Sequence, residues 1–213
     1  MLLTHHGHAC VELRADSGDS ILIDPGSLAD DLSHVPTPGA VLITHKHEDH
    51  LDLKRLEGIV AAAPVPVFAP ADAEDDLRAA GFTDVRVLAD GPVEPIAGFR
   101  VSAGARAHET IYPGLPLPEN IALTIDDRLY HPGDSLQPPG RAVDVLLLPL
   151  GAPWLKLAEI IDFAKTVAPR LVIPIHQGGL AEAHRRLHCG LLTRMLPEGS
   201  HLVTPDPGVA FTV

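Results

Sequence analysis

The chain of 213 residues is poor in aromatic side chains, in cysteine and in long apolar runs. Aromatic residues make up 4% of it, so a core must be built mainly from Val, Leu, Ile and Ala. The two cysteines, Cys10 and Cys189, form no disulfide framework, which favours a reducing compartment. No apolar run approaches the roughly 20 residues that cross a bilayer. The first residues also lack the basic and apolar regions of a secretory signal, so we expect a cytoplasmic location and no membrane association.

Positive charge is scarce as well, with 16 Lys and Arg against 28 Asp and Glu and a formal net charge of −12. A field of this sign repels nucleic acid and anionic lipid at long range. It does not exclude a phosphorylated small substrate, because bound divalent cations would dominate the local field. We therefore expect a small molecule as the partner, and the sequence gives no indication of the oligomeric state.

The hydrophobic pattern places strands before helices in both halves of the chain, as in an α/β protein. In the first half it predicts strands at 9–13, 20–24, 40–44, 65–68 and 85–88 and helices at 51–63 and 72–80. In the second half it predicts strands at 99–105, 121–125, 128–131, 143–149 and 170–175 and helices at 157–167 and 180–196. Segments 201–204 and 209–213 are expected to form a closing hairpin. This order indicates an αββα sandwich, two packed mixed sheets with outer helices, in a single domain spanning 1–213.

Histidine is abundant, with 13 residues, and its most informative cluster directly follows the predicted strand 40–44. There the sequence from His45 to His50 has the form His-x-His-x-Asp-His. Because side chains at i and i+2 of extended backbone point to the same side, His45 and His47 can contact one ion. Asp49 and His50 follow where the chain turns into a helix and can address a second ion. Imidazole and carboxylate suit zinc, so a metal site is favoured over the alternative of a helix-capping turn that happens to be rich in histidine.

Three later residues have matching chemistry and placement: His108, Asp134 and His176 each follow a predicted strand. Ligand sites in α/β sheets commonly lie at the C-terminal edge of the strands. Taken singly, His108 also fits a surface or hydrogen-bonded histidine, Asp134 fits an ordinary Pro-Gly-Asp turn, and His176 is undecided. Their joint occurrence after the histidine-rich motif favours metal binding.

Asp24, the His-x-His-x-Asp-His segment, His108, Asp134 and His176 together resemble the metallo-β-lactamase superfamily over nearly the whole chain. The segments Gly7-His-Ala-Cys-Val11, Gly133-Asp-Ser135 and Pro174-Ile-His-Gln-Gly178 further resemble its ascorbate-phosphate lactonase-like branch of small metal-dependent hydrolases. Ser135 stands where the family often has Thr. The resemblance implies the αββα fold and two metal ions. It places His45, His47 and His108 on the first ion, Asp49, His50 and His176 on the second, and Asp134 between them.

The resemblance also implies a dinuclear hydrolase in which metal-bound hydroxide attacks a lactone, ester, amide or phosphodiester of a small molecule. We expect zinc, with Mn²⁺ and Fe²⁺ as alternatives that ligand type alone does not separate. Asp49 is expected to orient the water and Asp24 to hold a ligand by hydrogen bonds. His8 is expected to assist the substrate or proton transfer. The alternatives are an Asp-Pro turn for Asp24 and a purely structural histidine for His8.

Two loops, 112–118 and 151–155, are predicted to border the metal edge. Their aromatic residues Tyr112 and Trp154 are candidates for substrate contact, with hydrophobic loop anchoring as the alternative. A metal-dependent nuclease or phosphodiesterase is the second enzyme hypothesis, and the acidic composition counts against it. A non-catalytic metal-binding protein is the third hypothesis, and the unbroken set of ligand types counts against that.

Overall fold

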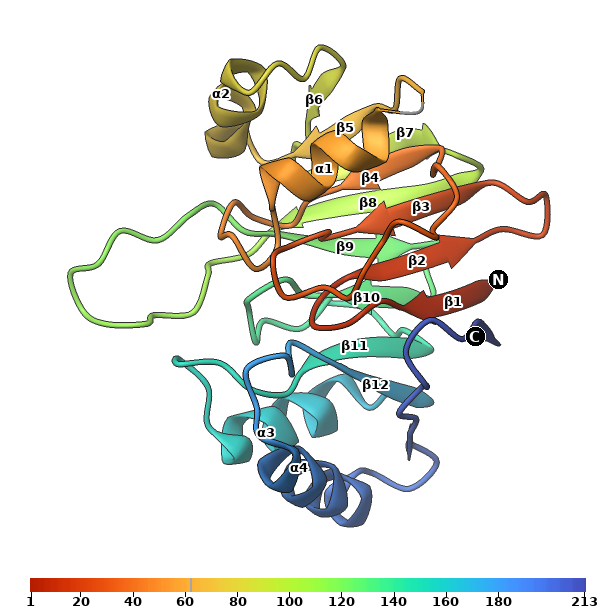
Figure 1. The fold of residues 1–213 in the computed structure, drawn as a ribbon. Helices are drawn as coiled ribbons and strands as arrows, with labels where there is room; N and C mark the ends of the chain where they lie inside the picture. Colours follow the sequence, from red (N-terminus) through yellow and green to blue (C-terminus); the bar gives the residue numbers. More distant parts are fainter. Residues whose placement is uncertain (62) are drawn as a thin grey trace.

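Two sheets packed face to face form the centre of the molecule, as the sequence predicts (Figure 1). The structure is a computed structural model that describes residues 1–61 and 63–213. In this part of the chain the strands of the first sheet are, in spatial order, β14 (Phe211–Thr212), β1 (Leu2–His5), β2 (Val11–Arg14), β3 (Ser20–Ile23), β4 (Ala40–Leu42), β5 (Val67–Ala69) and β6 (Val85–Val87). Those of the second are β13 (His201–Leu202), β12 (Leu171–Ile175), β11 (Val145–Pro149), β10 (Leu129–His131), β9 (Ile121–Ile125), β8 (Phe99–Ala105) and β7 (Gly91–Ile96).

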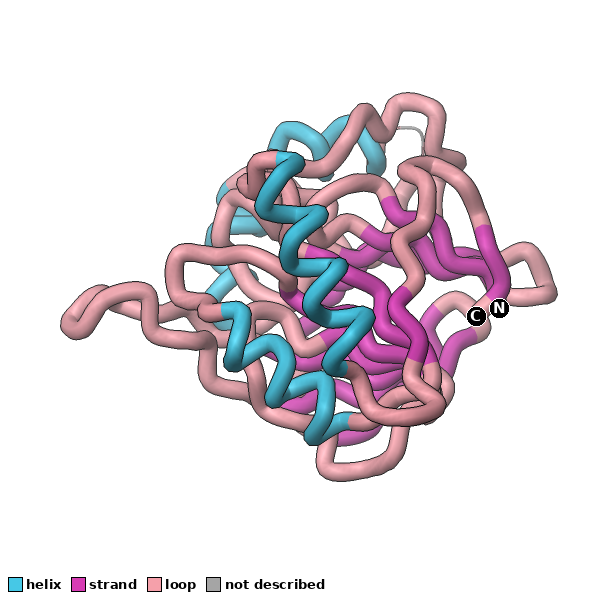
Figure 2. The backbone as a smooth tube through the Cα atoms, turned by 90° about the horizontal axis from the view of Figure 1, so that it is seen from below, coloured by secondary structure: helices cyan, strands magenta, loops and turns pink. Residues whose placement is uncertain are grey.

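Both sheets are mixed and share one pattern. The first sheet is antiparallel from β14 to β3 and parallel from β3 to β6. The second is antiparallel from β7 to β10 and parallel from β10 to β13. Because β1 pairs with β14, the two termini lie side by side, as Figures 1 and 2 both show.

Helices cover the outer face of each sheet (Figure 1). The first sheet carries α1 (Leu53–Val60) and α2 (Ala71–Ala79), and the second carries α3 (Leu157–Val167) and α4 (Glu182–Met195). α1 begins at Asp52, whose side chain accepts hydrogen bonds from the backbone N–H groups of Lys54 and Arg55. Among the described helices, none is long and apolar enough to span a lipid bilayer.

Consecutive residues of the central strands face different layers, as the two-residue period of a strand requires. In β3, Ile21 and Ile23 pack between the sheets, whereas Leu22 packs in the cluster beneath α1 and α2. In β11, Leu147 packs between the sheets, whereas Leu148 packs beneath α3 and α4. Three apolar clusters thus separate four layers. Runs such as β11 are buried on both faces, which explains their unbroken aliphatic sequence.

The structure corrects the predicted closing hairpin at 201–204 and 209–213. β13 pairs with β12 in the second sheet and β14 pairs with β1 in the first, so the two segments belong to different sheets. The connection between them contains Pro205 and Pro207, and Gly208 donates its N–H to the carbonyl of His5. A tight hairpin turn is therefore replaced by a crossing from one sheet to the other.

Two strands were not predicted, and one predicted helix is shorter. β7 contains Pro92 and Pro95, which argue against a strand in general but are tolerated at the edge of a sheet. β1 is short and shows no clean alternation. The helix predicted at 51–63 begins at Leu53 and ends at Val60, and Ala62 of that prediction lies outside the described residues.

Candidate metal centre

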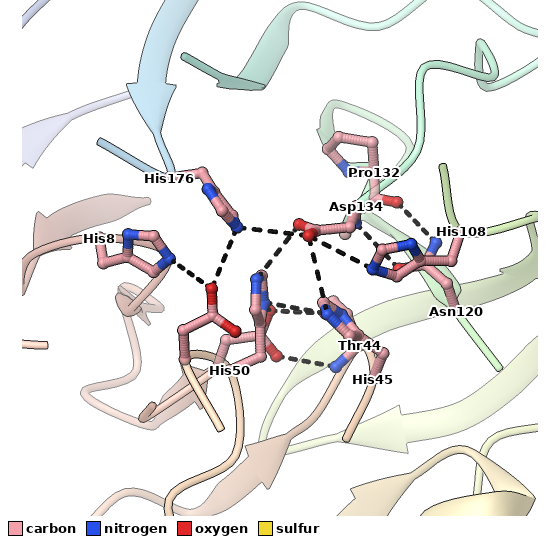
Figure 3. A network of polar contacts seen from close by, with 12 residues as sticks. His8, Thr44, His45, His50, His108, Asn120, Pro132, Asp134 and His176 are labelled. Atoms are coloured by element: carbon pink, nitrogen blue, oxygen red, sulfur yellow. Dashed lines mark hydrogen bonds and ion pairs between the residues drawn. The ribbon is translucent and has the colours of Figure 1, made fainter. Parts of the chain in front are cut away.

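The candidate site is formed by loops that follow strands of both sheets and meet at one end of the two sheets. His45 follows β4, His108 follows β8, Asp134 follows β10, and His176 directly follows β12. A further loop, after β1, brings His8 to the same place. Figure 3 shows His8, His45, His50, His108, Asp134 and His176 pointing toward one another, as the predicted site requires.

Asp134 lies at the middle of this cluster. Its Oδ2 is 3.4 Å from His108 Nε2 and 3.3 Å from His176 Nε2. His45 Nε2 lies 3.8 Å from the same oxygen, and His50 Nε2 lies 3.2 Å from Oδ1. One carboxylate therefore faces histidines from both sheets, the position that an ion-bridging ligand needs.

Side chains orient the histidines of the first sheet. His50 donates from Nδ1 to Asp24 Oδ2 at 2.7 Å. Thr44 donates its hydroxyl to the same Asp24 oxygen at 2.6 Å, so its Oγ1 is left to accept from His45 Nδ1 at 3.1 Å. Because each Nδ1 carries the proton, each Nε2 presents a lone pair toward Asp134 and can hold a metal.

Backbone carbonyls orient the histidines of the second sheet. His108 donates from Nδ1 to the carbonyl of Glu109 at 2.7 Å, and His176 donates from Nδ1 to the carbonyl of Gly151 at 2.7 Å. Their Nε2 atoms therefore present lone pairs as well. His47 completes the first group, with its ring centre 4.7 Å from that of His108.

The residues fit metal ions, because several buried polar atoms at the centre of the cluster have no hydrogen-bond partner. These atoms, among the described residues, are Nε2 of His45, His50, His108 and His176 and Oδ1 of Asp134. Leaving one buried polar atom without a hydrogen-bond partner destabilises a protein by about 1–3 kcal/mol. Several such atoms at one point therefore indicate that a bound group occupies the site. Lone pairs of imidazole and carboxylate converging on one volume match a transition metal.

His8 lies at the site, but its hydrogen bonds are those of a ring that donates to Asp49 and not those of a metal ligand. Its ligand atom lies within 4.8 Å of those of Asp49, His50 and His176, so by distance alone it belongs with the second group. However, Gly178 donates its N–H to His8 Nδ1 at 3.1 Å, which places the ring proton on Nε2. That proton is donated to Asp49 Oδ2 at 3.2 Å. His8 therefore orients Asp49, and both its nitrogens are already engaged.

The electrostatics favour positive charge between the carboxylates. Burial acts to raise the pKa of Asp49, but the imidazoles of His176 and His8 beside the carboxylate hold this pKa well below its usual range. Burial acts to lower the pKa of His176, but Asp134 and Asp49 raise it to about 9. The pKa of His50 is likewise raised despite burial, first of all by Asp134. Divalent cations would supply the same positive charge and displace these protons.

Asp24 is fully buried and contacts the cluster through hydrogen bonds to Thr44 and His50. Besides His50 and the Thr44 hydroxyl, its carboxylate accepts the backbone N–H of Thr44 at 2.7 Å. Asp24 has φ +49°, and His8 and His176 also have positive φ, at +48° and +57°. Such backbone is uncommon outside glycine and tends to gather at functional sites.

Three residues that hold the loops of the site, Gly26, Gly133 and Asn120, were not among the predicted site residues. A Cβ on Gly26 would lie 1.9 Å from the carbonyl oxygen of Asp49, so only glycine permits this approach. A Cβ on Gly133 would lie 2.1 Å from Asn120 Oδ1, which accepts the N–H of Asp134 at 2.9 Å. The motifs Asp24-Pro-Gly26 and Pro132-Gly133 indicate turns in the sequence. Their spacing does not indicate which distant segments the two glycines approach.

The two predicted substrate-contact residues differ in position. Trp154 donates its indole N–H to Asp134 Oδ2 at 3.1 Å, and its ring centre is 6.2 Å from that of His108 and 6.1 Å from that of His176. Trp154 therefore borders the cluster. Tyr112 is 68% exposed on the loop between β8 and β9, and the structure does not bring it to the proposed ligands.

Comparison with known proteins identifies the family of this arrangement. The family model described as the Beta-lactamase superfamily domain matches residues 2–176. The chain belongs to the metallo-β-lactamase superfamily. Among its relatives, protein Rv0786c of Mycobacterium tuberculosis is 36% identical over 99% of this chain and 100% of its own length. The UPF0173 metal-dependent hydrolase Ta0764 of Thermoplasma acidophilum is 26% identical, with 80% of each chain covered.

A solved structure matches the whole chain. Igni18, described as a novel metallo hydrolase from Ignicoccus hospitalis, aligns with a TM-score of 0.75 at 22% identity, covering 100% of this chain and 98% of its own. This likeness supports the αββα fold. With superfamily relatives named metal-dependent hydrolases, the chain is an enzyme of the metal-dependent hydrolase class.

Proposed function

We propose that this superfamily member is a dinuclear hydrolase, with zinc as the expected metal, acting on a lactone, ester, amide or phosphodiester of a small molecule. The observation that carries the proposal is the convergence of unpartnered, buried Nε2 atoms around Asp134. His45, His47 and His108 would hold one ion, and Asp49, His50 and His176 the other. Asp134 would lie between the two ions, since its oxygens face histidines of both groups.

The proposed chemistry is hydrolysis by activated water. When bound, two such ions lower the pKa of water toward about 7 and polarise the oxygen of the scissile group. Asp49 is the more open of the two carboxylates to solvent, with 29% of its side chain exposed against 3% for Asp134. Asp49 would orient that water, because His8 already holds its Oδ2. Asp24 would keep His50 in its ligating tautomer.

We propose that His8 assists proton transfer by positioning Asp49. Its Nε2–H is donated to Asp49 and its Nδ1 accepts the N–H of Gly178, so the neutral ring holds the Asp49 carboxylate in place and gives up no proton of its own. The backbone of His176 also donates to the carbonyl of His8 at 2.8 Å, which ties this loop to the second sheet. The small-molecule partner and the cytoplasmic location remain predictions, as does the nuclease alternative.

Metal analysis combined with a substrate panel tests the proposal. The purified protein should carry about two transition-metal ions per chain and hydrolyse at least one lactone, aryl ester or phosphodiester in preference to single-stranded RNA. Asp49→Ala should lower kcat by more than about 100-fold, because it removes a ligand and the water-orienting group. Glu48→Ala is the matched control, since Glu48 is exposed and its hydrogen bond among the described residues is a backbone one, accepted from the N–H of Ser27. Equal turnover by Asp49→Ala and Glu48→Ala would refute the mechanism.

A further inference from the structure

The loop between β8 and β9 carries an unusual group of exposed apolar side chains. Ile111, Tyr112, Leu115 and Leu117 are 37%, 68%, 52% and 39% exposed. Residues 110–118 contain no charged side chain, although 21% of the chain is charged. We call the segment Ile111–Leu117 the apolar tip. It projects away from the body of the molecule in Figure 1, and the same projection is visible from below in Figure 2.

Both stems of this loop hold Asp134. At the first stem, Glu109 donates its N–H to the carbonyl of Asp134 at 2.9 Å. At the second stem, Asn120 accepts the N–H of Asp134 with its Oδ1 at 2.9 Å. The two backbone polar groups of the proposed bridging ligand are therefore bound by the two ends of one loop. A contact made by the apolar tip is therefore connected to the metal centre through the hydrogen bonds of Glu109 and Asn120 to Asp134.

The stems are anchored while the apolar tip is not. Glu119 donates its N–H to Asp72 Oδ2 at 3.1 Å, and Asp72 donates its N–H to Glu119 Oε2 at 3.3 Å, which fastens the second stem to α2. In 110–118, the hydrogen bond found among the described residues is that from Leu115 N–H to the carbonyl of Tyr112. A tip with fixed ends and few bonds of its own can change its contacts.

We infer that the substrate of the metal centre carries an apolar group and that the apolar tip covers this group. The inference rests on the proposed hydrolase function. The ring of Trp154 adds a second apolar surface beside His108 and His176. An apolar acyl chain or ring placed between the tip and Trp154 would hold the scissile bond at the metal centre. A second copy of the chain is a less favoured partner for the apolar tip, because a stable protein–protein interface takes about 20–30 residues a side and the tip is a single short segment.

A binding experiment without turnover tests this inference. Trp154 is the single tryptophan of the chain, so the fluorescence of the metal-loaded protein reports on ligands beside Asp134. Acetate and hexanoate serve as probes, since both offer a carboxylate to the metals and differ in apolar length. At about 0.8 kcal/mol per buried methylene, burial of only two of the additional methylenes makes hexanoate bind about 15-fold more tightly.

Two double variants give the decisive contrast. In Tyr112→Ser/Leu115→Ser the ratio of hexanoate to acetate affinity should fall below about 2-fold. In the control Leu187→Ser/Val209→Ser, which replaces side chains that are 53% and 55% exposed elsewhere, the ratio should stay at the wild-type value. An unchanged ratio in the tip variant would overturn the inference. So would a change of molar mass in the tip variant alone, because the tip would then join copies of the chain.

Aryl acetate and aryl hexanoate separate this inference from the proposed function. A chain-length preference that disappears with the tip supports both. If wild type and the tip variant turn over the two esters with the same kcat/KM, the proposed apolar substrate group is overturned. The proposed hydrolase function is not affected by that result. No turnover of either ester or of a phosphodiester, with the binding preference for hexanoate retained, contradicts the hydrolase proposal while supporting the role of the tip in binding.

Discussion

The two sheets repeat one strand pattern but support their histidines by different means. In the first sheet, side chains orient the rings, with Asp24 holding His50 and Thr44 holding His45. In the second sheet, backbone carbonyls orient the rings of His108 and His176. A side-chain support can be replaced by mutation without changing the strand path, whereas a carbonyl is available only if the loop has the right backbone. The first half of the site thus depends on residue type and the second on loop conformation.

Asp134 is where the two halves meet, so its replacement should have the largest effect. In Asp134→Ala we expect the metal content to fall from about two ions to fewer than one per chain and kcat to fall by more than about 100-fold. His47→Ala, which touches one group only, should retain about one ion. Elemental analysis after gel filtration measures both variants. Equal metal content in the two variants would show that Asp134 does not serve both groups.

Removal of the side-chain support in the first sheet should have an intermediate effect. In Asp24→Ala, Thr44 and His50 lose their acceptor, and we expect metal affinity to fall by about 10–100-fold. Competition with a chelator measures the affinity. Asp52→Ala, which removes a helix cap on the neighbouring α1, is the control and should leave metal affinity unchanged. If both variants bound metal like wild type, orientation by side chains would be unimportant in this half.

The smallest effects are expected from glycines that permit close approach of the loops. Gly26→Ala places a methyl group against the Asp49 carbonyl, and Gly133→Ala places one against the Asn120 side chain at a backbone with φ +60°. Each should lower the free energy of unfolding by about 1–3 kcal/mol, and Gly26→Ala more, because backbone yields less than a side chain. Gly179→Ala has nothing within 4 Å of the added Cβ and should change stability by less than about 0.5 kcal/mol.

Urea unfolding of chelator-treated protein provides the measurement for the glycine variants. Removal of the metals is needed because ion binding would add its own stabilisation to each curve. A larger loss in Gly133→Ala than in Gly26→Ala would indicate that the second-sheet loop is the more rigid of the two. That result would strengthen the contrast between residue type and loop conformation.

Much of the fold was predictable because each strand carries its own signal. The strand predictions at 99–105 and 121–125 and the helix at 157–167 agree with β8, β9 and α3 to the residue. Buried aliphatic runs and a helix bounded by Ala168-Pro169 need no tertiary information. The hairpin predicted at the C-terminus failed because local turn chemistry does not reveal that β13 and β14 pair with strands of different sheets.

The candidate site was predictable where chemistry is dense and not where it is dispersed. Four candidate ligands among the six residues from His45 to His50 predict a metal motif by spacing alone. Asn120, Thr44 and the indole of Trp154 carry no such signal, since each is an ordinary residue in its own segment. Their roles follow from contacts with Asp134 or Asp24.

The amino-acid sequence by itself determined the strand and helix segments, the residue types available for metal binding and the turns that carry them. Local periodicity and local turn chemistry suffice for these, because they involve neighbours along the chain. Only the tertiary structure decided which ring nitrogen faces the centre and that His8 is a donor to Asp49. It also decided that one loop holds both sides of Asp134. Those properties depend on hydrogen bonds between segments far apart in the sequence, which exist only once the two sheets have packed.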